Sequence, residues 1–293
     1  MKGIMLNPRN WLLLLCAILL VDGNGLVQGA ERKSRIKRIE GPATAPLGSV
    51  AKIDLPEGYF FLDGKTTREL MKAAGEPVSG DELGLVQPTN ADWSVLFEFS
   101  DIGYVKDDDK DKLNPDKLLA EIKKGNAQAN KERVRSGNAP LEIVGWEIPP
   151  KYNPETHNLE WAIRATSEGH EILNYNTRLL GRKGVMEVVL IIEPESFQAS
   201  LPAFHDLLTN YTFSTGNSYA EFRSGDKIAK YGLGALVLGG AAVGAAKLGL
   251  FAWLLVFLKK GWKLVIIAFA AVAAFVKKIF NKITGRSDDS DTA

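Results

Sequence analysis

Cysteine is almost absent from this chain of 293 residues, because the only one is Cys16, inside an N-terminal apolar run. A lipoprotein signal has a small residue just before its cysteine, whereas Leu15 is bulky, so lipidation is not expected. Removal of the run on export would leave a chain without cysteine. The sequence therefore excludes disulfides and thiolate metal sites in the mature protein, and it predicts a domain stabilised by packing alone.

Histidine and recognisable catalytic motifs are also scarce. The three histidines, His157, His170 and His205, show no metal-ligand spacing, and each is expected to have a surface or capping role. The sequence contains no nucleophile elbow, Walker loop or dinucleotide fingerprint. We therefore assign no catalytic, cofactor-binding or metal-ligating residue. A catalytic site assembled from residues scattered along the chain stays open as an alternative.

Two further patterns resemble functional sites without completing them. Asp107–Asp111 looks like the start of a calcium loop, but Lys112 stands where the sharp turn needs glycine. Leu118 stands where a glutamate ligand belongs, so a solvated loop is predicted instead. Three tryptophans could line a ligand groove, but their apolar neighbours favour core packing: Trp93, Trp146 and Trp161.

Charge of one sign is not in excess, since 36 basic residues face 35 acidic ones. Net charge therefore indicates no nucleic acid or other partner. The stretch Glu31–Glu40 is locally basic, which fits a solvated linker or, alternatively, contact with anionic lipid headgroups. Prolines and glycines in Gly41–Gly48 place the start of a folded domain near Ser49.

The N-terminus has the pattern of an export signal. Lys2 and Arg9 precede the apolar run Trp11–Val21, and a small, polar segment with a plausible cleavage point near Gly29 or Ala30 follows. The run is short for a membrane span, so cleavage is favoured over the alternative of an uncleaved anchor.

Alternating apolar and polar residues predict half-buried strands at Trp93–Phe99, Leu159–Ala165 and Leu173–Leu179. Val185–Ile192 is apolar on both faces and is expected to be a central strand. From Leu159 onward these runs predict an antiparallel meander. The remaining strands are expected at Leu141–Ile148, with a bulge at Gly145, and at Val50–Leu55, Tyr59–Leu62 and Tyr211–Phe213.

Helices are expected between the groups of strands, at Lys65–Ala74 after Asp63, from Asn114-Pro115 towards Arg135, and at Glu195–Asn210. Strands that come in runs, with helices between the groups, predict the α+β class: an antiparallel sheet with flanking helices, followed by one or more C-terminal transmembrane helices. The order of elements resembles the small sandwich of photosystem II subunit P, which is an analogy of fold and implies no function.

Long apolar runs dominate the last quarter of the chain. Gly232–Leu258 exceeds the roughly 20 apolar residues that a membrane span requires. As a helix it would be about 40 Å long, which exceeds a hydrocarbon core of about 30 Å, so tilt or partial exposure is expected. Leu264–Val276 follows and could be a short return span, a re-entrant element or a packing partner.

Small residues and lysines give this region its candidate functional residues. Gly240 and Gly244 have the spacing that allows close helix packing and self-association, although such spacing is common in any span rich in glycine and alanine. Lys247 would lie near mid-span, as a polar contact in a helical assembly or, by the favoured alternative, snorkelling towards the interface. The interface residues that follow the span are Lys259, Lys260, Trp262 and Lys263.

By the positive-inside rule, these lysines belong in the cytoplasm, which agrees with export of the large domain. We therefore expect a protein of the bacterial inner membrane with its main domain in the periplasm. The expected organisation is a signal peptide (1–30), a basic and Pro/Gly-rich linker (31–48), an exported α+β domain (49–225), a membrane anchor region (226–286) and an acidic tail (287–293).

Several stretches resemble a bacterial family of membrane-anchored proteins known as domain of unknown function 2167. They are Gly48–Leu62, Gly145–Tyr152, His157–Trp161, Asn174–Asn176 and Arg178–Arg182, together with the Ala/Gly-rich tail that ends in Lys-Lys-Gly-Trp. The resemblance covers nearly the whole mature chain. It implies no activity, cofactor or site residue, because the family has no established activity.

Our leading hypothesis is non-enzymatic: an exported domain, held at the bilayer by C-terminal helices, binds or scaffolds a partner. One alternative is an envelope hydrolase with a dispersed site. Another is a subunit of a membrane transport or stress-response complex, assembled through Lys247 and the glycine face. The expected partners are the lipid bilayer and, through the glycine-rich helix, other membrane proteins or a second copy.

Overall fold

A computed structural model describes residues 37–73, 78–135 and 139–239 of the chain. Its centre is an antiparallel sheet of eight strands in the order β1-β4-β5-β6-β10-β9-β8-β7. These strands are β1 (Arg38–Glu40), β4 (Tyr59–Asp63), β5 (Glu82–Pro88), β6 (Trp93–Ser100), β7 (Glu142–Asn153), β8 (Asn158–Ser167), β9 (His170–Leu180) and β10 (Val185–Ile192). A smaller sheet has the order β11-β3-β2, with β2 at Ala43–Leu47, β3 at Ala51–Leu55 and β11 at Tyr211–Phe213.

The predicted α+β class and the meander are confirmed, since β8, β9 and β10 pair in sequence order. Strand β10 lies between β9 and β6, and this central position explains why both of its faces are apolar. Strand β6 differs from its prediction: it is buried on both faces, with Phe97 and Ser94 each fully buried. Alternate side chains of β6 therefore point into two different cores, rather than one set into a core and the other into solvent.

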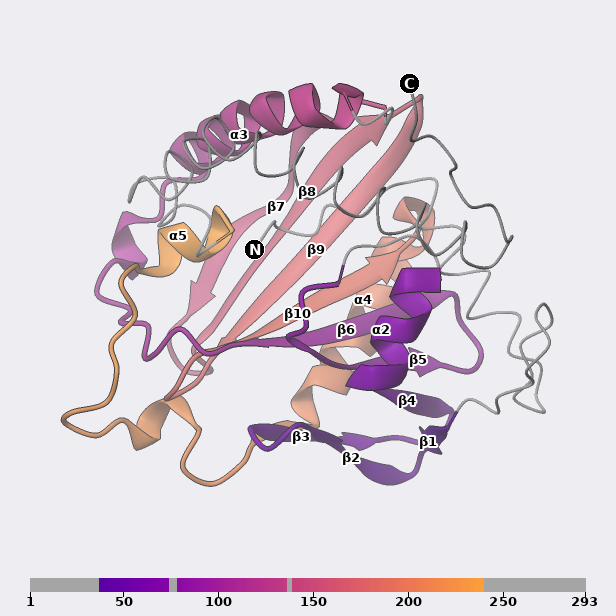
Figure 1. Cartoon of the computed structure of the whole chain (residues 1–293), viewed down its shortest axis with the longest axis vertical. Helices are drawn as coiled ribbons and strands as arrows, with labels where there is room; N and C mark the ends of the chain where they lie inside the picture. Colours follow the sequence, from indigo (N-terminus) through magenta and orange to yellow (C-terminus); the bar gives the residue numbers. More distant parts are fainter. Residues whose placement is uncertain (1–36, 74–77, 136–138, 240–293) are drawn as a thin grey trace, which may run out of the picture. The chain divides into compact units, whose positions relative to one another are not determined.

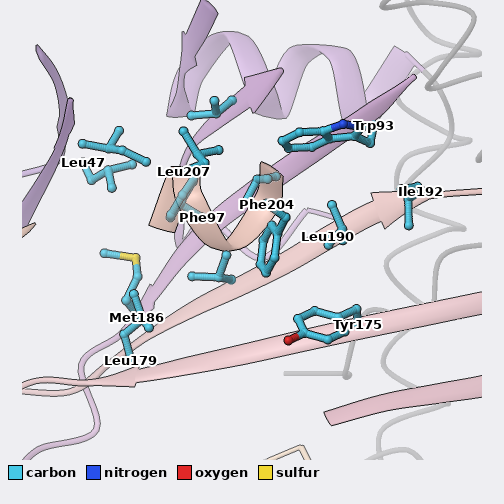
Figure 2. Packing of buried hydrophobic residues seen from close by; sticks show 14 of the residues in the cluster. Leu47, Trp93, Phe97, Tyr175, Leu179, Met186, Leu190, Ile192, Phe204 and Leu207 are labelled. Atoms are coloured by element: carbon cyan, nitrogen blue, oxygen red, sulfur yellow. The ribbon is translucent and has the colours of Figure 1, made fainter. Parts of the chain in front are cut away.

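One face of the large sheet packs against helix α4 (Pro194–Thr209) and the small sheet. Figure 2 shows Phe204 and Leu207 of α4 over Phe97 and Leu190, with Leu47 of the small sheet nearby. All five side chains are at most 1 % exposed. Removing a side chain of this size from such a core costs about 3–5 kcal/mol, so this layer contributes much of the stability.

The opposite face packs against α2 (Gly64–Ala73), α3 (Pro115–Arg135) and α5 (Leu233–Val237) in two separate apolar clusters. Helix α2 lies beside β4 and β5, whereas α3 and α5 lie at the β7–β8 end (Figure 1). The middle strands β6, β10 and β9 carry polar side chains between the two clusters. This face therefore combines apolar ends with a polar centre.

Local chemistry explains where the helices begin. The Asp63 carboxylate accepts a hydrogen bond from the Thr66 backbone N–H (2.8 Å) at the start of α2. The Asn114 side chain does the same for the Lys117 N–H (2.9 Å), with Pro115 in the first turn of α3. Both caps agree with the predictions. The predicted bulge is also present, because the register of β7 against β8 shifts between Ile143 and Gly145.

The folded unit extends beyond both expected edges of the domain. Strands β1 and β2 lie within the predicted linker 31–48, and Ala45 and Leu47 of β2 are fully buried. At the other edge, Leu233, Leu236 and Val237 of α5 are at most 5 % exposed, although the prediction placed them in a membrane span. Strand β5 has no counterpart in the prediction. Within the described ranges, no helix is both long enough and apolar enough to cross a membrane.

Candidate functional site

The residues predicted to act in the membrane lie outside the described part of the chain: Gly240, Gly244, Lys247, Lys259, Lys260, Trp262 and Lys263. The other singled-out residues can be placed. Trp93 and Trp161 are 3 % exposed core residues, and the indole N–H of the half-buried Trp146 donates to the Pro115 carbonyl (3.1 Å). Core packing is therefore confirmed for Trp93 and Trp161, whereas Trp146 is partly buried at the edge of a core cluster.

The aspartate-rich loop that resembled a calcium site instead fastens α5 to the domain. The Asp109 carboxylate accepts hydrogen bonds from the backbone N–H groups of Leu233 (3.2 Å) and Gly234 (3.5 Å). Gly232 allows this approach, because a Cβ built there would lie only 2.5 Å from Asp109 Oδ2. No group of three potential metal ligands occurs among residues 37–73, 78–135 and 139–239. The loop therefore holds the start of α5 in place through the Asp109 carboxylate.

Asp107, two residues earlier, holds a hydrogen-bonded chain of three side chains. The Tyr152 hydroxyl lies 3.0 Å from Asp107 Oδ2 and 3.0 Å from His157 Nδ1. Because a carboxylate can only accept, the Tyr152 hydroxyl donates to Asp107 and must accept from His157. This arrangement assigns the proton to Nδ1 of His157 and leaves Nε2 as its second ring nitrogen. Burial, and then the bond to Asp107, raise the pKa of Tyr152, so it stays a neutral relay.

Four aromatic rings stack beside this chain in the order Phe222, Tyr104, Tyr219, His157. Successive ring centroids are 4.4, 4.4 and 4.2 Å apart. The Tyr219 hydroxyl donates to the Val105 carbonyl (3.0 Å), which fixes the middle of the stack. His157 has a φ of 55°, in the left-handed region that histidine adopts more readily than most residues. The stack thus holds the imidazole in one orientation.

A solvent-open hollow adjoins the stack. Its lining residues are Lys106, Asp108, Asp109, Lys112 and the segment 228–232. The backbones on either side are paired, because the Tyr104 N–H donates to the Lys227 carbonyl and the Ala229 N–H donates to the Tyr104 carbonyl, both at 2.8 Å. Two loops that are distant in sequence therefore meet where α5 begins.

A second polar cluster crosses the middle strands as a row of charged side chains. Glu82, Glu98, Glu187 and Arg178 occupy matched positions on β5, β6, β10 and β9. Arg178 pairs with Glu187 (3.0 Å), while Ser79 Oγ lies 2.9 Å from Glu98 and 3.0 Å from Glu82. Glu82 also accepts backbone N–H bonds, so every member of the row has a partner.

Burial and hydrogen bonds act in opposite directions on the two buried glutamates of this row, and a different one prevails at each. Burial raises the pKa of Glu98 to about 7, with the neighbouring Glu187 and Glu82 adding to the rise against the Ser79 hydrogen bond and Arg178. Hydrogen bonds from Ser79 and Gly80 outweigh burial at Glu82 and lower its pKa. The Ser79 hydroxyl has one proton to donate. If it donates that proton to the ionised Glu82, a protonated Glu98 can donate to Ser79, which agrees with the lowered pKa of Glu82 and the raised pKa of Glu98.

One of the other two histidines, His205, has a similar arrangement. His205 Nε2 lies 3.0 Å from the Tyr175 hydroxyl, which donates to Glu160 (3.0 Å), so this histidine caps a buried tyrosine. His170 is exposed at the start of β9. The surface or capping role predicted for the histidines thus agrees with these two. His157 shares the link to a carboxylate through a tyrosine, and it differs in its close stacking on Tyr219 and its positive φ.

Sequence reasoning missed the Asp107–Tyr152–His157 chain. Tyr152 and His157 end and begin two of the stretches quoted for the family resemblance, and these meet across the β7–β8 turn. The closeness of these two stretches in sequence could have indicated a contact between Tyr152 and His157. Asp107 gave no such signal, because 45 residues separate it from Tyr152.

Comparison with known proteins places the chain among proteins without an assigned activity. A family model described as "Protein of unknown function (DUF2167)" matches residues 39–270. No curated protein matches. A solution structure of cyanobacterial PsbP (CyanoP) from Synechocystis sp. PCC 6803 matches with 11% identity and a TM-score of 0.36, covering 64% of this chain and 99% of that one. At that TM-score the match does not test the resemblance to photosystem II subunit P.

Proposed function

The chain belongs to the DUF2167 family of proteins of unknown function, and from this premise we propose that it is a membrane-anchored protein of the bacterial envelope. In this proposal, its α+β domain binds or scaffolds a partner at the membrane surface. The observation that carries the proposal is the burial of α5 in the domain core immediately before the longest apolar stretch of the chain.

The end of α5 changes the length available for a span. The sequence alone allowed a span from Gly232, about 40 Å long as a helix. With α5 held in the domain, the 19 residues 240–258 remain, and as a helix they would be about 28 Å long. This length fits a hydrocarbon core of about 30 Å without tilt. The family match continues to residue 270, so the apolar stretch belongs to the family's pattern.

This span also sets an orientation. Lys259, Lys260 and Lys263, with Trp262 beside them, follow it and favour the cytoplasmic side. The folded domain is then periplasmic, in agreement with the export signal at residues 1–30. Lys247 stays close to mid-span, where a helix partner across the Gly240 and Gly244 face would offset part of its cost.

Protease accessibility on intact spheroplasts tests the topology, with one tag on each end of the mature chain. We expect added protease to remove the N-terminal tag and to leave the C-terminal tag intact until the cells are lysed. Leu254→Arg, which places a charge in the proposed span, should release the chain, whereas Val144→Arg at an exposed position of β7 should not. Cleavage of the C-terminal tag in intact spheroplasts, or protection of both tags, would contradict the proposed orientation.

A second candidate function, hydrolysis, is favoured by one observation. A carboxylate that orients an imidazole through a hydroxyl follows the logic of a general base. However, no serine, threonine or cysteine hydrogen-bonds His157 in the described part of the chain. Broad-substrate screening of the full chain, with His157→Ala and His170→Ala compared, separates the two functions. Turnover that is lost only with His157→Ala would favour a hydrolase.

A further inference from the structure

Large apolar side chains are exposed at few places in the described part of the chain, and two of them lie together. Phe222 and Ile228 are each 40% exposed. Both flank Tyr104: the Phe222 ring lies 4.4 Å from the Tyr104 ring, and Ile228 pairs with Tyr104 through the backbone. The other two, Val134 and Val144, lie on α3 and β7. Together with the Tyr104 ring, these two side chains form a small exposed apolar patch.

The backbone that presents these side chains is held in place. Glu221 accepts the N–H groups of Gly216 (2.8 Å) and Ser218 (2.9 Å) in a capping box just before Phe222. Asp226 accepts both an Arg182 side-chain pair (2.7 and 2.8 Å) and the Arg223 N–H (2.7 Å). Phe222 and Ile228 are therefore directed outward by a fixed loop.

The basic and acidic side chains around the neighbouring hollow differ in whether they bind partners within the domain. Three lysines line it, Lys106, Lys112 and Lys230, and none of their ammonium groups has an ion pair or hydrogen bond with another described residue. Most of the acidic groups of the same loops bind inward: Asp107 to Tyr152, Asp109 to α5, Glu221 to backbone and Asp226 to Arg182. Asp108, which also lines the hollow, is an exception among the described residues, so three ammonium groups and one carboxylate without a side-chain partner border it.

The hollow lies close to the point where the described chain ends. Gly232 lines the hollow and α5 starts at the next residue. The described chain ends at Gly239, seven residues later, and at 1.5 Å per helical residue the end of α5 lies within roughly 12 Å of the hollow. The apolar stretch 240–258 follows directly, with no spacer between it and the domain.

We propose that Phe222, Ile228 and the three lysines of the hollow form a lipid-contact surface that rests on anionic phospholipid headgroups beside the anchor. The inference rests on the proposed membrane anchoring. The apolar side chains would enter the interfacial region, as aromatic and aliphatic residues do at membrane surfaces. The ammonium groups would bind headgroup phosphates, which adds electrostatic attraction that depends on anionic lipid. The domain would then have one fixed face towards the membrane.

Site-specific fluorescence on the full chain in nanodiscs tests this contact. In a Cys16→Ser background, single cysteines at Phe222→Cys, Ile228→Cys and the control Val144→Cys receive an environment-sensitive dye. Nanodiscs contain phosphatidylcholine with or without phosphatidylglycerol, and a lipid spin-labelled near its headgroup serves as quencher. We expect a loss of fluorescence at 222 and 228 with phosphatidylglycerol, little loss without it, and none at 144. Replacing Lys106, Lys112 and Lys230 together by glutamine should remove the difference between the two lipids.

The outcomes separate this inference from the proposed function. A chain that elutes with the nanodiscs but shows no quenching at 222 and 228 overturns the contact surface and leaves the anchor standing. Equal quenching in both lipids overturns the role of the lysines. Elution apart from the nanodiscs overturns the anchor and the contact surface together. Testing two patch positions guards against one cysteine variant that fails to fold.

Discussion

Glu98 gives the sharpest stability prediction, because it is a carboxyl buried in the middle of the large sheet. It is 8% exposed and its pKa is raised from 4.5 to about 7, chiefly by burial. Replacing it with glutamine keeps the shape and a hydrogen-bonding partner for Ser79 but removes the group that ionises. The prediction is that Glu98→Gln is more stable than the natural chain at high pH and similar to it at low pH.

The direction in which stability changes with pH follows from proton binding by the folded and unfolded states. Between pH 4.5 and about 7 the folded state keeps the Glu98 proton while the unfolded state has lost it, so the free energy of unfolding falls as pH rises. A shift of this size corresponds to at most about 3 kcal/mol, from 1.36 kcal/mol per pKa unit. Stability from this group is therefore complete below pH 4.5 and is lost as pH rises through 7. Glutamine has no such loss.

Urea unfolding of the full chain in a mild nonionic detergent, from pH 4 to pH 8, measures the effect. The gap between Glu98→Gln and the natural chain should open across pH 4.5–7 and stay constant above it. Glu121→Gln is the control, since Glu121 lies on α3 with a side chain that is 60% exposed, and it should change stability by less than about 0.5 kcal/mol. A gap that is independent of pH, or a less stable Glu98→Gln at pH 8, would refute the reasoning.

Two further predictions concern the Asp109 cap of α5 and the proton on the His157 ring. Gly232→Ala should lower the free energy of unfolding by about 1 kcal/mol, because the added Cβ would displace the Asp109 carboxylate that caps α5. The control is Gly125→Ala, in open space on α3, which should raise the free energy of unfolding by up to about 1 kcal/mol. Thermal unfolding compares the two variants. His157 should carry its proton on Nδ1, which nitrogen NMR reads directly, and Tyr152→Phe should remove that preference. A Gly232→Ala chain as stable as the natural one, or a neutral His157 protonated on Nε2, would count against this description.

Much of the fold could be predicted because local patterns agreed with it. Strand alternation located the β8–β10 meander, and Asp63 and Asn114 marked the helix starts where the structure has them. Strand β5 was missed because Gly84 and a register shift beside it interrupt its alternation. The edge strands β1 and β2 were missed because Pro42 and Pro46 mark this stretch as a linker.

Most of the candidate site could not be predicted, because apart from the local pair Tyr152 and His157 its parts come together only through tertiary structure. Asp107 and Asp109 looked like an incomplete metal loop until α5 and Tyr152 supplied their partners. The apolar residues of α5 looked like the start of a span, since burial in a core and burial in a bilayer select the same residue types. Only the packing of Leu236 and its neighbours separates the two.

The central claim is that a folded domain ends at α5 and is held at a bilayer by the apolar residues directly after it. Ultracentrifugation of lysed cells without detergent tests it most directly, with the full-length chain followed by its tag. We expect the chain in the membrane pellet, and its release only when detergent is added. Full-length chain that stays in the supernatant without detergent would contradict the account.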